Sequence, residues 1–260
     1  MKTLRNILLL ALMSAFVINL TSCSSDKDDE VKFGDMNMET GTEENIKNGD
    51  GLTWKSENDL IASVSGSVVS AVRQGSVVIA SDKGSFKVNV TPKHTLYSDP
   101  CFEWGSSVSH VKSFMKGYRL FNETDKVLLY NGTGAVEYVA YLFENSKLND
   151  SGVYVKPAYM DDLVEHLNER YVYVGTDDNY NTYYASPNKR MAVGVGAQYL
   201  GGNYYYLVVF TDAKSLDTAK AMKQKGLKSV FGNGMRSNDN AKQEGCKHLM
   251  QKLIQKTGIK

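Results

Sequence analysis

The order of apolar patterns in the second half of this chain restricts its fold more than any other feature. Residues 106–156 and 157–210 each begin with a helix-like pattern and continue with four short strand-like runs. Asn131-Gly132 is a strong signal for a tight hairpin, and Pro157 suits the first turn of a helix. This order predicts an antiparallel sheet that carries helices on one face.

The two segments agree in detail. The strand candidates are residues 118–121, 127–130, 135–143 and 148–156 in the first unit and 171–174, 182–185, 191–199 and 204–210 in the second. The first helix is predicted to use Val108, Val111, Phe114 and Met115 as its apolar face. Each unit also places a valine seven residues before a tyrosine, at Val111 and at Val164. The pattern predicts a duplicated α+β domain over residues 93–260.

Two more helices are predicted beyond residue 213. The first is marked by Leu216, Ala219 and Met222. The second begins at Asn240, which can cap it together with Gln243. The apolar side of this last helix is formed by Cys246, Leu249, Met250 and Leu253.

A helix and an antiparallel meander, repeated twice, are similar to tandem-repeat inhibitor folds such as β-lactamase inhibitory protein. They are also similar to small outer-membrane assembly lipoproteins of the BamE type. Both likenesses are at the level of the fold and transfer no functional residue. They imply a sheet with one face open for binding.

Residues 33–92 carry short β-branched runs that glycine-containing turns separate. Such runs predict a small β-sandwich, which Pro92 ends because proline has no N–H for a sheet. The runs Trp54-Lys55-Ser56-Glu57-Asn58, Ile61-Ala62-Ser63-Val64-Ser65, Val69-Ser70-Ala71-Val72 and Gly75-Ser76-Val77-Val78-Ile79 resemble the bacterial Ig-like group 2 (BIG2) module. The resemblance implies an Ig-like spacer or stalk with Trp54 buried between its sheets.

The start of the chain has the layout of a bacterial signal peptide. Lys2 and Arg5 precede an apolar run of about 14 residues, shorter than the ~20 that span a bilayer. The run ends in Leu20-Thr21-Ser22-Cys23, which resembles a lipobox and implies that Cys23 is lipidated once residues 1–22 are removed. Two or more acyl chains hold a protein stably on a membrane. A plain secreted protein with an incidental cysteine, or an uncleaved anchor, is the alternative.

Residues 23–32 are predicted to form an acidic tether. Ser24 and Ser25 precede a run of acidic side chains that ends at Glu30. This pattern resembles the export signal of surface lipoproteins in Bacteroidota, which implies an outer-membrane lipoprotein displayed on the cell surface. A solvated linker has the same composition, so an inward-facing position stays open.

Composition and motifs give little chemistry. The net charge of +1 argues against nucleic acid as a partner. No histidine pair has H-E-x-x-H spacing and no serine lies in G-x-S-x-G, so we expect no catalytic residue, metal or cofactor. Residues 177–181 are rich in oxygen ligands and could hold calcium. They lack the glycine and the glutamate of an EF-hand, which favours a hairpin loop.

With Cys23 lipidated, two cysteines remain. A disulfide between Cys101 and Cys246 would join the start of the second domain to its last helix, and such bonds form outside the cytoplasm. The alternative is a pair of buried thiols, because Cys246 lies on the apolar side of its predicted helix.

Tyrosine is concentrated in the second unit, where nine of the sixteen lie between residues 171 and 206. Gly194 and Gly196 alternate with valines in a neighbouring strand, so one side of that strand is nearly bare. One interpretation is a shallow tyrosine-lined surface for protein or glycan, with Tyr183, Tyr184, Tyr204 and Tyr206 as candidate contacts. The other is a groove that a helix or aromatic neighbours fill.

These patterns together predict a membrane-anchored lipoprotein that binds a protein or a glycan and performs no catalysis. Residues 33–92 would act as a stalk and residues 93–260 as the binding head. An inhibitor or envelope-assembly factor is an alternative, as is a glycan-acting enzyme with an unrecognised site. A glycosidase of the common type needs two carboxylates across a cleft.

Overall fold

The computed structural model describes residues 32–213 and 240–257, and most of their regular structure is β. The last described element is the helix α5 (Asn240–Thr257). Cys23, the tether before Lys32 and the tail helix predicted around Ala219 lie outside the described residues. No helix in the described stretches is long and apolar enough to cross a membrane.

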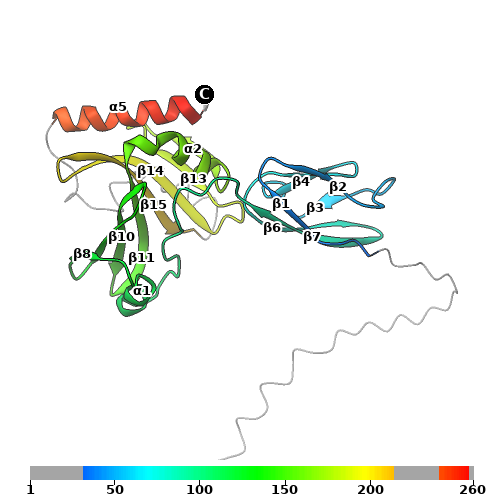
Figure 1. The fold of residues 1–260 in the computed structure, drawn as a ribbon, viewed down its shortest axis with the longest axis horizontal. Helices are drawn as coiled ribbons and strands as arrows, with labels where there is room; N and C mark the ends of the chain where they lie inside the picture. The colour runs from blue at the N-terminus through cyan, green and yellow to red at the C-terminus, as the bar shows by residue number, and fades with distance from the viewer. Residues whose placement is uncertain (1–31, 214–239, 258–260) are drawn as a thin grey trace, which may run out of the picture. The chain divides into compact units, whose positions relative to one another are not determined.

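Residues 36–91 form two small sheets around one core (Figure 1). In order of pairing, the strands are β1 (Met36–Glu39), β7 (Gly84–Thr91), β6 (Gly75–Ser81) and β3 (Lys55–Ser56) in one sheet, and β2 (Glu43–Asn45), β5 (Val68–Ala71) and β4 (Ala62–Ser65) in the other. β1 runs parallel to β7, and the other pairs are antiparallel. Alternate side chains of both sheets, such as Val88 and Val69, meet in the shared core.

Trp54 lies in that core and is 8% exposed. Its ring packs edge-on against Phe33 and Phe86, with centroids 4.7 and 5.5 Å away. Its indole N–H donates a hydrogen bond to the carbonyl of Gly49 at 3.0 Å. The single polar group of the buried ring therefore has a partner.

The following residues form one eight-stranded antiparallel sheet. In spatial order its strands are β12 (Val172–Thr176), β13 (Thr182–Ala185), β14 (Met191–Leu200), β15 (Asn203–Asp212), β11 (Lys147–Val155), β10 (Val136–Glu144), β9 (Val127–Asn131) and β8 (Leu120–Glu123). β8 to β11 form one meander and β12 to β15 another, and β11 pairs with β15 where the meanders meet. The antiparallel sheet and the C-terminal helix predicted from the sequence are confirmed.

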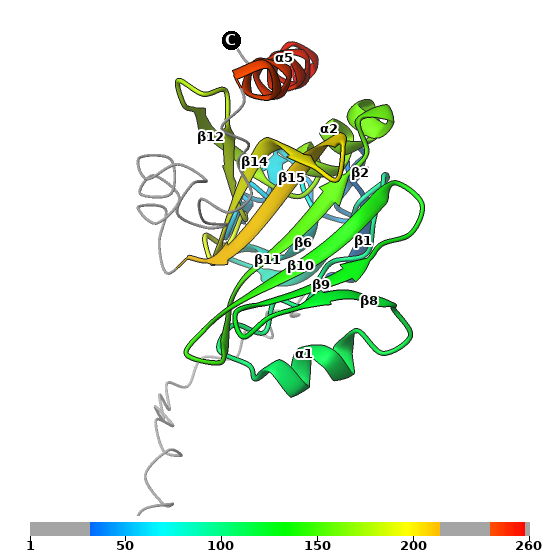
Figure 2. The same ribbon diagram turned by 90° about the vertical axis from the view of Figure 1, so that its left-hand side faces the viewer.

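A helix precedes each meander. α1 (Val108–Phe114) begins at Ser107, whose side chain accepts a hydrogen bond from the His110 N–H. α2 (Met160–Asn168) follows the short 3-10 turn η1 (Pro157–Tyr159). Figure 2 shows α1 beside the β8 end of the sheet, while α2 and α5 lie towards the β12 end.

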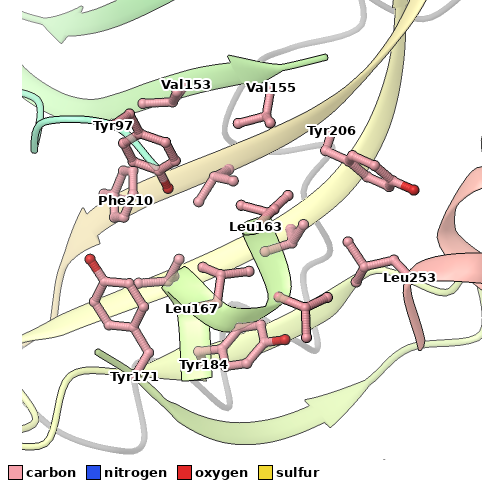
Figure 3. Packing of buried hydrophobic residues seen from close by; sticks show 14 of the residues in the cluster. Tyr97, Val153, Val155, Leu163, Leu167, Tyr171, Tyr184, Tyr206, Phe210 and Leu253 are labelled. Atoms are coloured by element: carbon pink, nitrogen blue, oxygen red, sulfur yellow. The ribbon is translucent and has the colours of Figure 1, made fainter. Parts of the chain in front are cut away.

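The helices share one face of the sheet, which we call the helix face. Near its centre Tyr206, Val208 and Phe210 of β15 pack with Leu163 of α2 and Leu253 of α5 (Figure 3). Near β8 a second cluster joins Val111 and Met115 of α1 to Tyr141 of β10. The strand residues in these clusters alternate with residues that point to the other side, as a pleated strand requires.

The other side of the sheet, which we call the reverse face, is also largely buried. Tyr205, Leu207 and Val209 of β15 and Tyr154 of β11 lie in its cluster and are at most 6% exposed. No residue of α1, α2 or α5 belongs to this cluster. Burial on both faces explains why these strands read as almost continuous apolar runs.

The two residues that follow α2 contact both the small sheets and the segment after them. The N–H of Gln74 donates to the carbonyl of Glu169 at 2.8 Å, and the Arg170 guanidinium donates to the carbonyl of His94 at 2.7 Å. The Glu169 carboxylate also meets the His94 N–H and ring at 2.8 and 2.7 Å. Burial would raise the pKa of Glu169, but the hydrogen bonds from His94 lower it below its usual value. This contact is therefore a polar junction between the two sheet systems.

Candidate binding surface

The tyrosines that the sequence suggested as a surface are mostly core residues. Tyr183, Tyr184 and Tyr206 are completely buried, and Tyr204 is half-buried. The Tyr206 hydroxyl donates to the carbonyl of Leu249 in α5 at 3.2 Å, and burial raises its pKa. The prediction of an exposed tyrosine face is wrong at these three positions, since Tyr184 and Tyr206 are buried in the cluster of the helix face and Tyr183 in that of the reverse face.

The bare side of β14 is filled by its neighbours. Gly194 pairs with Tyr183 on one side and with Val209 on the other, so large side chains flank the missing one. The Tyr183 hydroxyl reaches the Asp177 carboxylate at 3.0 Å. Aromatic filling, the alternative kept open from the sequence, is what the structure contains.

The loop at residues 177–181 is a hydrogen-bonded turn. Asp177 Oδ1 accepts from the N–H groups of Asn179 and Asn181 at 2.9 Å each, and Oδ2 accepts from the Asn181 side chain at 2.9 Å. These bonds occupy the carboxylate that calcium would need, so the hairpin loop is the better interpretation. Nowhere in residues 32–213 and 240–257 do three His, Cys, Asp or Glu side chains gather as metal ligands would.

Cys101 and Cys246 are not joined in the structure, and both remain thiols. Cys101 is 1% exposed and belongs to the cluster beneath α1, where burial raises its pKa. Cys246 is half-buried on α5. The structure therefore contains no disulfide between them: Cys101 lies in the cluster beneath α1, and Cys246 lies on α5, whose core residues belong to another cluster.

One short segment carries the exposed large hydrophobic side chains of the described chain. Phe114, Tyr118, Leu120 and Phe121 are 48%, 43%, 38% and 57% exposed. The sequence placed Phe114 on the buried face of its helix, but Val108, Val111 and Met115 pack between α1 and the sheet while Phe114 is 48% exposed. Contiguous exposed apolar groups of this kind mark interaction sites more often than chance.

A hollow of about 450 Å³ lies beside this segment, between β8, the β9–β10 turn and the start of β10. We call it the β8–β10 hollow. Phe121 forms part of its wall, and Tyr138 faces that ring with a centroid distance of 5.1 Å. Asn131 and Thr133 contribute amide and hydroxyl groups. Its volume is in the range of small-ligand sites.

The charged groups of the β8–β10 hollow are Arg119, Glu137 and Lys156. The Lys156 ammonium lies 3.3 Å from Glu137 and donates to the carbonyl of Gly134 at 2.9 Å. Within the described residues the Arg119 side chain is exposed and has no ion pair or hydrogen bond. The hollow therefore carries one cation more than its own carboxylate balances.

A second, smaller hollow of about 90 Å³ lies between α5 and the end of β14. Asn181, Tyr199 and Cys246 line it, and the Lys242 ammonium sits 4.9 Å from the centre of the Tyr199 ring. This space holds only a few water molecules, so it is a weaker candidate for a ligand.

Sequence reasoning did not select Arg119, Phe121 or Tyr138. A usable signal was present, because five large apolar residues lie within residues 114–121 and a single helix turn cannot bury them all. Their exposure depends on where α1 ends and on how β8 pairs, and neither follows from the local pattern.

No protein-family model matches this chain. A search of curated proteins and a search of solved structures also gave no match. What the chain does must therefore follow from its own residues and their geometry.

Proposed function

We propose that this protein is an outer-membrane lipoprotein, anchored through Cys23 and displayed on the cell surface, that binds a protein or a glycan without catalysis. The lipobox-like Leu20–Cys23 and the serine and acidic residues after it support the anchor and the address. The exposed cluster at residues 114–121 beside the β8–β10 hollow is the observation that carries the binding role.

We also propose that residues 33–92 are an Ig-like module of the BIG2 type that acts as a spacer. Two sheets around one core, a first strand parallel to the last, and a buried Trp54 support this assignment. The order of one helix and four strands, present twice after residue 107, supports an internal duplication in residues 93–260.

Binding without catalysis is favoured because a single carboxylate lines the β8–β10 hollow. Glu137 is the one carboxylate among its lining residues, and Lys156 is paired with it. The common glycosidase mechanisms need two carboxylates that flank the glycosidic bond, and the lining of this hollow supplies one of them. An inhibitor or assembly role would use the same exposed apolar residues on a protein partner.

The test is capture from an envelope extract together with a glycan array, both with the mature chain from residue 23. We expect a ligand that Phe121→Ala loses and that Lys87→Ala, an exposed change on β7, retains. Equal capture by both variants would remove residues 114–121 from the binding role. For the anchor, mass spectrometry of the mature N-terminus should find acyl chains on Cys23, and an unmodified cysteine would end that part of the proposal.

A further inference from the structure

We propose that the β8–β10 hollow binds an acidic oligosaccharide, with an aromatic platform for the sugar ring and cations for its carboxylate. This inference rests on the proposed binding function and names its ligand class. Three observations support it: the shape and polarity of the hollow, the fixed position of Tyr138, and the unbalanced charge of Arg119.

The lining of the hollow suits a sugar better than an apolar ligand. Its large apolar side chains are Phe121, Tyr138 and Val136, and the other lining residues are polar, charged or glycine. A pyranose has a weakly apolar C–H face and a rim of hydroxyls. Aromatic faces attract the former through their negative π-clouds, and amides and hydroxyls such as Asn131 and Thr133 hydrogen-bond the latter.

Tyr138 is held rigidly. Its ring contacts Tyr154 and Tyr205 edge-on, with centroids 6.0 and 6.2 Å away, and both of these tyrosines are buried in the reverse face. Phe121 then extends the aromatic row outwards from Tyr138 into solvent. A platform that does not reorganise on binding loses little conformational entropy.

The cations select the charge of the ligand. Lys156 is fixed by Gly134 and Glu137, whereas the Arg119 guanidinium has neither an ion pair nor a hydrogen bond to the described residues. A guanidinium binds a carboxylate through two parallel hydrogen bonds. A sugar acid that stacks on the Phe121 ring can therefore place its carboxylate at Arg119, which lies two residues away in the same wall.

A protein partner is the less favoured occupant of the hollow itself. Protein interfaces centre on apolar anchors in dry pockets, with polar groups at the rim. Here the polar groups Arg119, Asn131 and Thr133 line the hollow. The apolar residues Phe114 and Tyr118 are exposed outside it, which is the opposite arrangement.

The test is isothermal titration of the mature chain with tetragalacturonic acid and with a hyaluronan tetrasaccharide. Neutral galactotetraose and a hexaglutamate peptide are the reference ligands. We expect at least one acidic sugar to bind and both references to bind at least about tenfold more weakly, since an Arg–carboxylate pair is worth a factor of that order. Arg119→Ala should remove the preference for acidic over neutral sugar, and Phe121→Ala should lower the affinity for the acidic sugar.

Two matched variants control for charge and aromatic content outside the hollow. Lys87→Ala and Tyr199→Ala change an exposed lysine and a half-buried tyrosine that lie outside residues 114–121 and do not line the hollow, and both should bind like the wild type. Thermal unfolding of each variant checks that it folds. Absence of binding by both acidic sugars, equal binding of hexaglutamate, or indifference to Arg119→Ala would overturn the inference. If the envelope capture still yields a ligand that depends on Phe121, the binding function survives without this ligand class.

Discussion

The buried His166 should make the folded state sensitive to mild acid. Its side chain is completely buried on α2, it stacks on Tyr97 with centroids 4.2 Å apart, and its Nδ1 accepts the N–H of Leu96 at 3.2 Å. Burial, and then the nearby positive charge of Arg170, lower the pKa of His166 from 6.5 to about 3. Protonation would place a second donor against the Leu96 N–H and a charge in the core.

The sign and size follow from proton linkage. The unfolded chain takes up a proton near pH 6.5, while the folded chain holds His166 neutral down to about pH 3. Unfolding therefore binds a proton in this window, and stability falls as the pH falls through it. At about 1.4 kcal/mol per pH unit, the loss between pH 7.5 and pH 5 is roughly 2 kcal/mol from this residue alone.

The assay is urea unfolding at pH 7.5, 6.5, 5.5 and 5.0 for the wild type and for His166→Asn. The asparagine side chain can still accept a hydrogen bond from the Leu96 N–H, but it does not titrate. Its cost in packing is the same at every pH, so it does not affect the change in stability between pH 7.5 and pH 5.0. All other ionisable groups are the same in both proteins, so their contribution cancels in the difference between the two pH profiles. The wild type should lose roughly 2 kcal/mol more than the variant between the extremes. Parallel pH profiles would refute the reasoning.

Three further outcomes follow from the packing. Leu163→Ala removes a fully buried side chain between α2 and the sheet, and urea unfolding should show a loss of about 3 kcal/mol. Gly245→Ala makes a methyl group collide with the Tyr204 hydroxyl, so the free energy of unfolding should fall by about 1–3 kcal/mol despite the better helix propensity of alanine. Tyr204→Ala in the same chain should relieve the collision. In the native state of residues 24–260, Ellman's reagent should react slowly at the buried Cys101. After unfolding it should count two thiols, Cys101 and Cys246, and a count of none would indicate a disulfide.

The sequence predicted the elements well where a single period dominates. The continuous run of aromatic and aliphatic residues at 204–210 identifies β15, and Asn131-Gly132 marks the turn between β9 and β10. Met250 and Leu253, chosen from the helical period, are the α5 residues in the core. These predictions need only the local pattern, since each side chain has one direction in a strand or helix.

The binding surface could not be predicted in the same way. Tyr183 and Tyr206 belong to a sheet that is buried on both faces, so alternation assigns each residue a side without saying whether that side meets water. Phe114 lies at the end of α1, one position before Met115, and only the latter fits under the helix. The exposure of a side chain depends on how elements that are distant in sequence pack together. Local patterns in a single sequence do not predict that packing.

The most direct test of the central claim, that the β8–β10 hollow is the binding site, is hydroxyl-radical footprinting of the mature chain with and without a saturating amount of whichever acidic tetrasaccharide binds more tightly. Phe121 and Tyr138 line this hollow, while Tyr199 lines the small hollow under α5 and serves as an internal reference. We expect oxidation of Phe121 and Tyr138 to fall severalfold on binding while that of Tyr199 stays constant. Protection at Tyr199 with no change at Phe121 and Tyr138 would contradict the account.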